Sequence, residues 1–428
     1  MSVLHHVVRT MHCEQRSQRW AKVVSAIFMV LALLAVPQAG RAQNTINPFE
    51  IKGHVDTTMG KLILQSADGA FMWWFDVRMF FDGAFYNENK NALHNGVEIR
   101  RGRFAVNTTL WKVWLAQLDV DYADNALSVK DAWMSYSPSS NSFIKVGNFK
   151  APFSLEELTS SLNEELFERS VDDAFAIGRR IGIGYTAWGQ QWQASAGVFG
   201  EALGNVDPAN GIDGGMAAAA RVTYAPILED RSVVHVGVDA GYETPDASTP
   251  NTMRIRTRPE TDISRARFIT TGNIGLVKNT LLYNGEAAAV FGPLMVQGEY
   301  TTAQLNRTVA TSPTLNFSGA YAFVGYVLTG ESHAYEVSQG EFQRLVPKGE
   351  FGAIELLLRA STINLNSGSV KGGKANEYAA EVDWYFTENT RFYLNFSYVN
   401  NDDNATGGGV YLGNDDFEII QFRFAVQF

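Results

Sequence analysis

The sequence predicts an all-β protein: a sixteen-stranded antiparallel transmembrane β-barrel over residues 70–428, with one loop folded inward as a constriction. Three observations lead to this prediction. The chain starts with an export signal, apolar and polar residues alternate with period two along most of the remaining chain, and the last strand alternates up to a terminal Phe428. An exported chain with this pattern is either a soluble β-protein or a membrane barrel.

The pattern of residues 1–42 is typical of a secretory signal peptide. A basic segment precedes the apolar stretch 23–36, and its basic residues are Arg16, Arg19 and Lys22. This stretch of 14 residues is too short for a membrane-spanning helix, which needs roughly 20. We therefore expect cleavage after residue 42 rather than a short membrane anchor. Residues 43–69 are then expected to form a periplasmic N-terminal lead-in to the barrel.

Composition narrows the possible partners. Of the 428 residues, 46% are apolar and 19% are charged, with a formal net charge of −10. Removing residues 1–42 takes away five basic residues and one acidic residue, which makes the mature charge about −14 and disfavours a nucleic-acid partner. It also removes Cys13, the only cysteine, so the mature chain has no disulfide and no thiolate metal site. No later stretch reaches 18 consecutive apolar residues, and no transmembrane helix is predicted.

Alternation is clear along residues 75–85, where Phe75, Val77, Met79, Phe81 and Phe85 lie on the face opposite to Asp76, Arg78 and Asp82. Comparable segments are about ten residues long, which is the length that a tilted transmembrane strand needs. Aromatic residues gather near the segment ends, as they do at membrane interfaces. Both features favour a barrel over a soluble sandwich.

The alternation predicts sixteen strands, an even number as single-chain bacterial barrels have. They are expected at 70–86, 96–108, 111–122, 127–137, 142–149, 179–188, 191–199, 214–225, 232–242, 280–291, 293–304, 316–329, 350–363, 375–387, 390–401 and 415–428. Short periplasmic turns alternate with longer external links, among them 150–178 and 243–279. The segment 330–349 is the exception, because it is long where the alternation requires a short turn.

Several short motifs follow one another along residues 98–200 and beyond. They are EIRRGRF at 98–104, LDVDYADN at 118–125, VKDAW at 129–133, VGNFKAPF at 146–153, LEELTS at 155–160, ERS at 168–170, GRRIG at 178–182, GP at 292–293, QGEY at 297–300 and LTGE at 328–331. In this order they resemble the phosphate-selective porin family, the phosphate- and polyphosphate-specific outer-membrane porins. The likeness covers most of the mature chain.

The resemblance implies a trimeric outer-membrane porin whose third loop folds into the lumen and whose basic residues attract anions such as phosphate or polyphosphate. The positions that match the family's pore-lining, anion-binding residues are Arg78, Arg100, Arg101, Lys130 and Lys150. Expected partners are the permeant anion, outer-membrane lipid and lipopolysaccharide, with no cofactor and no metal. A general or other-anion diffusion porin, and a plugged structural or adhesive barrel, remain alternatives.

Adjacent Arg100 and Arg101 pose a physical problem. Strict alternation sends one of them into lipid, at a cost of about 2–4 kcal/mol at the bilayer midplane. A bulge at Gly102, or an arginine that reaches a membrane interface, removes the conflict. The hypothesis is that Arg78 and Arg100 line the constriction; the alternative is that the arginines pair with Asp76, Asp82 and Glu98 in the wall.

The segment 150–178 is the candidate constriction loop. Ser154 with Glu157, and Ser161 with Glu164, have capping-box spacing, and leucines at 155, 158, 162 and 166 then mark one helical face. The segment is rich in acids, which repel phosphate if they face the lumen. A helical cap on the surface is the alternative.

The predicted external loop 243–279 carries a cluster of arginines: Arg254, Arg256, Arg258, Arg265 and Arg267. They are candidates for a funnel that attracts anions. Solvated or paired arginines, or contacts with lipopolysaccharide, explain the cluster equally well.

Enzyme chemistry is not indicated. The mature histidines are His54, His94, His235 and His333, which lack metal-ligand spacing. A Ser–His pair such as an outer-membrane lipase uses depends on tertiary proximity that a sequence does not reveal. We therefore expect a channel rather than an enzyme.

Overall fold

A computed structural model describes residues 51–56, 61–123, 126–203, 215–245, 251–309 and 311–428. The expected signal peptide, residues 1–42, lies outside these ranges. Within them, no helix is both long enough and apolar enough to cross a membrane.

Sixteen of the described strands pair side by side, each antiparallel to its neighbours, and form a closed barrel. They are β3 (Phe71–Asn87), β4 (Gly96–Leu110), β5 (Trp114–Asp121), β6 (Ser128–Ser139), β7 (Ser142–Lys150), β8 (Arg179–Trp188), β9 (Trp192–Phe199), β10 (Ala217–Glu229), β11 (Ser232–Glu243), β14 (Val277–Phe291), β15 (Leu294–Arg307), β16 (Leu315–Val327), β19 (Ala353–Ser367), β20 (Val370–Thr387), β21 (Thr390–Asn401) and β22 (Asp416–Gln427). Each one overlaps a strand expected from the alternation, so the predicted fold class is confirmed.

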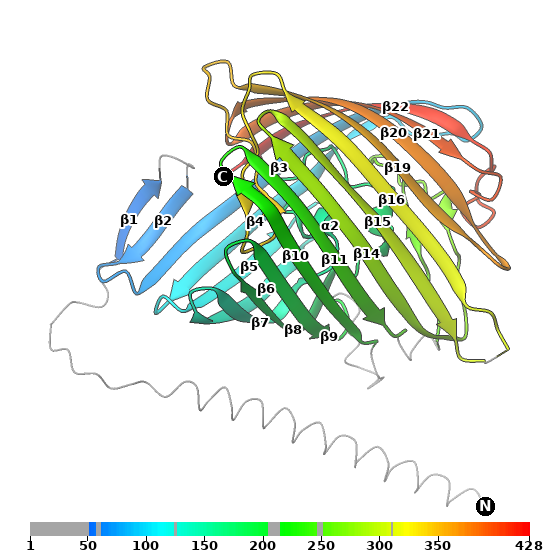
Figure 1. The fold of residues 1–428 in the computed structure, drawn as a ribbon. Coiled ribbons are helices and arrows are strands. Elements are labelled where there is room, and N and C mark those ends of the chain that lie inside the picture. Colours follow the sequence, from blue (N-terminus) through cyan, green and yellow to red (C-terminus); the bar gives the residue numbers. More distant parts are fainter. Residues whose placement is uncertain (1–50, 57–60, 124–125, 204–214, 246–250, 310) are drawn as a thin grey trace, which may run out of the picture. The chain divides into compact units, whose positions relative to one another are not determined.

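The barrel closes where β22 pairs with β3, from Glu418 opposite Asn87 to Gln427 opposite Arg78 (Figure 1). The terminal Phe428 completes this seam, because its backbone N–H donates to the carbonyl of Val77 at 3.0 Å and its carbonyl accepts from the Val77 N–H at 3.4 Å. Closure satisfies the backbone polar groups of both edge strands, as a lipid environment requires.

The barrel wall is apolar outside and polar inside. On β14, Tyr283 is 50% exposed while the next residue, Asn284, is 4% exposed; on β19, Leu358 is 59% exposed and Arg359 is 4% exposed. A soluble protein would show the opposite pattern, with apolar residues buried. The exposed apolar face is the one that contacts lipid, and the buried polar face lines the lumen.

Two more strands precede the barrel within the expected lead-in 43–69. β1 (Ile51–Asp56) pairs with β2 (Lys61–Ser66), and β2 pairs with the start of β3 around Met72–Trp74. The first residues of β3 lie beyond the end of β22, and β2 pairs with this part of the strand instead.

The constriction loop, residues 151–178, links β7 to β8 and folds inward. It contains α2 (Leu155–Leu158), capped by the Ser154 hydroxyl, which accepts from the Glu157 N–H at 3.2 Å, and the 3-10 helix η1 (Val171–Phe175). The helix is shorter than the leucine spacing predicts. Lys150 donates to the carbonyls of Glu157, Leu158 and Thr159, which ends α2, and Ser161 receives a hydrogen bond from Arg78 instead of capping a second turn.

The segment 328–352, which links β16 to β19, accounts for the unexpectedly long connection. It contains the short strands β17 (Tyr335–Glu336) and β18 (Glu341–Phe342), and it contacts lumen-facing residues of the wall. Arg221 of β10 donates to the carbonyls of Gln339 and Gly340, and the Tyr335 hydroxyl lies 2.7 Å from His235 Nδ1. This second inward segment, named here the inner segment, enters from the end of the barrel that carries Phe71 and Phe428.

Residues 251–276 of the external loop also pack inward, with β12 (Arg256–Thr257) and β13 (Ile269–Thr270) forming a small ribbon. Apolar residues of this loop and of the constriction loop share one core with the inner face of the wall, including Phe153, Phe175, Phe268, Leu305 and Phe417. Burying each such side chain contributes about 1.5–3 kcal/mol, which holds both loops inside the barrel.

Candidate functional site

The described residues enclose two sizeable cavities inside the barrel, one on each side of the constriction loop. The inner cavity, about 520 Å³, lies on the side of the inner segment. It is lined by parts of β3–β9, the constriction loop and the inner segment. Its basic residues are Arg78, Arg101, Arg103, Lys145, Lys150, Arg169 and Arg179, and its acidic residues are Asp119, Asp131 and Glu341. Positive charge therefore predominates in this part of the lumen.

The outer cavity, about 350 Å³, lies between the constriction loop and the external loop 244–276. Its basic residues are Arg100, Arg101, Arg169, Arg256, Arg258 and Arg267, and its acidic residues are Glu168, Asp173 and Glu260. Here too the basic residues outnumber the acidic ones.

Arg101 and Arg169 line both cavities and so mark the boundary between them. Arg169 of the constriction loop contacts Glu157 at 2.8 Å and Glu164 at 2.7 Å, and Arg101 of the wall contacts Glu164 at 3.5 Å. Glu164 thus bridges a loop arginine and a wall arginine at this boundary. These two arginines therefore lie beside both cavities.

A β-bulge places Arg100 and Arg101 on the same side of the wall. In the pairing of β3 with β4, Phe80 lies opposite Arg101 and Phe81 lies opposite Ile99, so Arg100 is the extra residue. Arg100 contacts Glu168 at 2.8 Å and lines the outer cavity, and Arg101 is 7% exposed. The expected bulge exists, although its extra residue is Arg100 rather than Gly102, and neither arginine faces lipid.

A second bulge occurs at Lys130, because Asp119 lies opposite Asp131 and Val120 lies opposite Val129. The ammonium group of Lys130 lies 3.9 Å from Asp121 and its side chain is 32% exposed. The bulges at Arg100 and at Lys130 thus each insert one basic residue into a strand. At each bulge the inward–outward alternation of the strand shifts by one residue, so the charged side chain does not point into lipid.

Arg78 and Lys150 line the inner cavity. Arg78 donates from Nη1 to the Ser161 hydroxyl at 3.1 Å, and within the described residues it forms no ion pair. The aspartates and glutamate that were its alternative partners are engaged elsewhere: Arg423 contacts Asp82 at 2.7 Å, Asn107 donates to Asp76 at 2.7 Å, and Arg265 lies 3.8 Å from Glu98.

The acids of the constriction loop are largely neutralised by arginines. Glu168 contacts Arg100 at 2.8 Å and Arg423 at 2.6 Å, and Glu156 contacts Arg359 at 3.4 Å. Burial raises the pKa of Glu164, but Arg169 and Arg101 outweigh it and lower this pKa to about 2. These carboxylates therefore attach the loop to the wall, and their charges are compensated locally.

The arginine cluster of the external loop divides between two positions. Arg256, Arg258 and Arg267 line the outer cavity, whereas Arg254 and Arg265 are exposed. Burial, followed by the positive charges of Arg256 and Arg258, lowers the pKa of Arg267. Arg258 also forms an ion pair with Asp262.

Lys145 is a lumen residue that the sequence pattern missed. Its ammonium group lies 4.2 Å from the ring centre of Trp133, 5.2 Å from that of Phe143 and 5.5 Å from that of Phe149. These aromatic rings face the lumen, where alternation assigns polar residues. The sequence did contain a signal for this lumen position, because Lys145 shares a face of β7 with Phe143 and Phe149 and a lysine is not expected to face lipid.

A closed sixteen-stranded barrel with an apolar outer face, a charged lumen and an inward loop has the architecture of an outer-membrane channel. Residues 72–428 match the family model described as "Phosphate-selective porin O and P". The chain therefore belongs to this porin family and is an outer-membrane protein.

Two relatives illustrate the similarity. Porin O of Pseudomonas aeruginosa is 27% identical over 401 residues, which cover 84% of this chain and 89% of the relative. An uncharacterized protein of Caulobacter vibrioides is 31% identical over 323 residues, which cover 71% of this chain. The matched region spans 63% of the length of the Caulobacter relative.

Solved structures share the fold at low identity. The anion-selective porin from Comamonas acidovorans superimposes with a TM-score of 0.55 at 12% identity, covering 84% of this chain and all of that one (100%). The trimer form of in-vitro folded OmpT from Vibrio cholerae gives 0.51 at 11% identity, covering 83% and 99%. At these identities the comparison establishes the barrel fold alone.

Proposed function

We propose that this porin passively conducts small hydrophilic anions, with phosphate or polyphosphate among them. One observation carries the proposal: Arg101 and Arg169 line both lumen cavities, and in each cavity the basic residues outnumber the acidic ones. Fixed positive charge at a narrow passage raises the local concentration of anions and lowers that of cations. In this role Arg78, Arg100, Arg101, Lys130 and Lys150 attract the permeant anion.

The pairing of the loop acids supports the same proposal. Glu164 and Glu168 are each held between arginines, whereas Arg78, Lys145 and Lys150 of the inner cavity have no carboxylate in ion-pair contact within the described residues: Arg78 donates to the Ser161 hydroxyl, Lys150 donates to backbone carbonyls, and Lys145 contacts aromatic rings. The acidic overall charge of the mature chain does not describe the lumen, because charge outside the permeation path has little influence on selectivity.

The test is the reversal potential of the purified protein in a planar bilayer under a KCl gradient, repeated with phosphate added. An anion-selective current that phosphate reduces supports both parts of the proposal. An anion-selective current without a phosphate effect supports a porin for other anions, and cation selectivity contradicts the proposal.

The inner segment favours a second candidate, a structural barrel whose lumen is filled. It occupies part of the lumen at the end opposite to the external loop, through contacts with Arg221 and His235. Absence of any single-channel current from correctly folded protein would support this candidate.

We also propose that the mature protein, exported with the help of the signal peptide at 1–42, assembles as a homotrimer in contact with outer-membrane lipid and lipopolysaccharide. The trimer form of the Vibrio cholerae neighbour motivates this assembly. Light scattering of the detergent-solubilised protein measures its mass, and a monomeric mass would contradict a trimer.

A further inference from the structure

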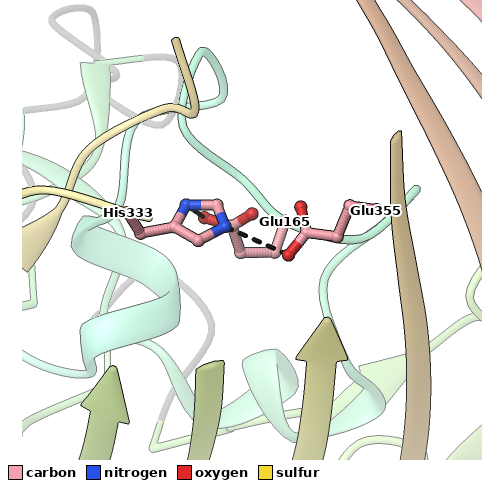
Figure 2. A group of neighbouring side chains, drawn as sticks. All are labelled: Glu165, His333 and Glu355. Atoms are coloured by element: carbon pink, nitrogen blue, oxygen red, sulfur yellow. Dashed lines mark hydrogen bonds and ion pairs between the residues drawn. The ribbon is translucent and has the colours of Figure 1, made fainter. Parts of the chain in front are cut away.

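Three buried side chains from three separate parts of the chain meet inside the barrel, and Figure 2 shows them together. Glu165 belongs to the constriction loop, His333 to the inner segment and Glu355 to β19 of the wall. Nε2 of His333 lies 3.0 Å from Oε1 of Glu355, and Nδ1 lies 3.3 Å from Oε1 of Glu165. Glu165 is 8% exposed, His333 1% and Glu355 0%.

Acidic side chains outnumber basic side chains in and around this cluster. Asp383 and Glu381 of β20 lie nearby, while Arg391 is the guanidinium that binds Asp383 and the backbone carbonyls of Glu164 and Glu165. Four carboxylates therefore surround one guanidinium and one imidazole.

Several carboxylate oxygens here lack a hydrogen-bond donor. Within the described residues, Oε1 of Glu165, Oε1 of Glu381 and Oδ1 of Asp383 are buried and accept no hydrogen bond. Such oxygens are unfavourable unless a proton or a cation satisfies them. Of these three oxygens, Oε1 of Glu165 belongs to the cluster, and a cation bound there would satisfy it.

We propose that Glu165, His333 and Glu355 form a binding site for a divalent transition-metal ion of the Zn²⁺ type. One imidazole nitrogen and two carboxylate oxygens are a donor set that suits Zn²⁺, whereas Ca²⁺ and Mg²⁺ take oxygen ligands almost exclusively. One candidate ligand atom from each residue lies within 4.8 Å of the others. Metal–ligand distances of about 2.0–2.2 Å require these atoms to draw closer by about an ångström, and a water molecule is expected in the fourth position.

The site would tie three segments together, because the constriction loop, the inner segment and the wall each supply one ligand. This metal site goes beyond the proposed conduction of anions. A structural metal bound there would hold both inward segments at one point of the wall. The histidines showed no metal-ligand spacing in the sequence because each ligand comes from a different, distant segment.

The test is isothermal titration calorimetry of the purified full-length protein in detergent, treated first with EDTA and then titrated with ZnCl2. The zinc content of the protein is also measured after dialysis. We expect one equivalent of Zn²⁺ per chain in the wild type, with loss of that equivalent in His333→Ala. His94→Ala is the matched control, since His94 is exposed and lies outside the cluster, and this variant should retain the equivalent.

Glu165→Gln keeps the test decisive if His333→Ala fails to fold, because the amide has the same shape and still removes a carboxylate ligand. Loss of Zn²⁺ binding in Glu165→Gln, with binding retained in His94→Ala, supports the site. No Zn²⁺ uptake by the wild type, or uptake that both His333→Ala and Glu165→Gln retain, overturns it and leaves an imidazolium paired with two carboxylates. Metal content is measured without any current, so this result is independent of ion selectivity.

Discussion

At the scale of single residues, the lumen separates arginines that hold structure from those available to solutes. Arg423 is 1% exposed and is held by Asp82 and Glu168, whereas Arg78 lines the inner cavity with one neutral partner, the Ser161 hydroxyl. A cation whose charge is already compensated by carboxylates attracts a passing anion weakly. Selectivity should therefore depend more on Arg78 than on the paired arginines.

Arg78→Gln should lower the preference for anions. Removing one unit charge about 10 Å from the permeant ion disfavours an anion by about 0.4 kcal/mol in water and favours a cation by the same amount, so the anion-to-cation permeability ratio should fall by about a factor of four. The reversal potential under a KCl gradient measures this change. Arg231→Gln, which removes an exposed arginine in the turn between β10 and β11, should leave the ratio unchanged; equal shifts in both variants would contradict the assignment.

Arg423→Met should reduce stability, because it leaves Asp82 and Glu168 buried without this partner. Breaking a buried ion pair from one side costs about 3–5 kcal/mol. Urea unfolding in lipid vesicles, followed by tryptophan fluorescence, measures the free energy of unfolding. The matched Arg231→Met variant should change it by less than about 1 kcal/mol, since exposed groups contribute little. Similar losses in the two variants would show that the pairs at Arg423 do not stabilise the fold.

At the scale of elements, two kinds of local irregularity build the lumen. The bulges at Arg100 and Lys130 let consecutive residues face inward, which strict alternation forbids. The constriction loop and the inner segment fold into the barrel because the polar wall offers partners for their backbones, such as Glu299, which accepts from the N–H groups of Leu155 and Glu156 at 3.0 and 2.7 Å. Function thus depends on departures from a regular barrel.

Replacing residues 333–344 of the inner segment with a Gly-Ser linker of equal length should increase single-channel conductance. The replacement removes Tyr335 and Phe342 from the lumen, together with the backbone that Arg221 binds. Conductance in KCl measures the change. The same replacement at 402–413, in the loop between β21 and β22, is the control and should have a much smaller effect. Unchanged conductance in the first variant would mean that the inner segment lies outside the permeation path.

At the scale of the whole molecule, the barrel is stable in lipid only when it is closed. The β22–β3 seam joins the two ends of the sheet, and the last backbone groups to pair are those of Val77 and Phe428. The exposed apolar outer face, with residues such as Tyr283 and Leu358, commits the folded protein to a bilayer. Closure and membrane insertion are therefore linked.

Deletion of Phe428 should reduce the yield of folded barrel in the outer membrane. It leaves the Val77 N–H and carbonyl without their partners at the seam, and each unsatisfied backbone group in lipid costs several kcal/mol. The folded fraction can be measured from the difference in gel mobility between unheated and heated samples. Phe428→Tyr, which keeps the backbone bonds and the aromatic ring, should fold with the yield of the wild type. If the deletion variant also folds as well as the wild type, the seam does not need its last backbone pair.

The barrel could be predicted from the amino-acid sequence alone. Period-two alternation is a local property of each strand, so sixteen strands and their order could be predicted without knowing which residues are in contact. The inward position of the loop at 150–178 was implied by the family resemblance. The adjacent Arg100 and Arg101 indicated either a bulge or an arginine that reaches a membrane interface, because a charge in lipid is costly. Family membership was indicated by motifs that lie in one order along the chain.

The contents and the lining of the lumen, in contrast, depend on contacts that form only in the folded barrel. The inner segment, the pairing of Glu164 with Arg101 and Arg169, the aromatic contacts of Lys145 and the cluster of Glu165, His333 and Glu355 all join residues far apart in the chain. Alternation predicts which face of the sheet a side chain occupies, but it does not predict which side chain lies opposite across the lumen. Charge compensation there depends on distances between distant segments, and those distances exist only once the barrel has closed.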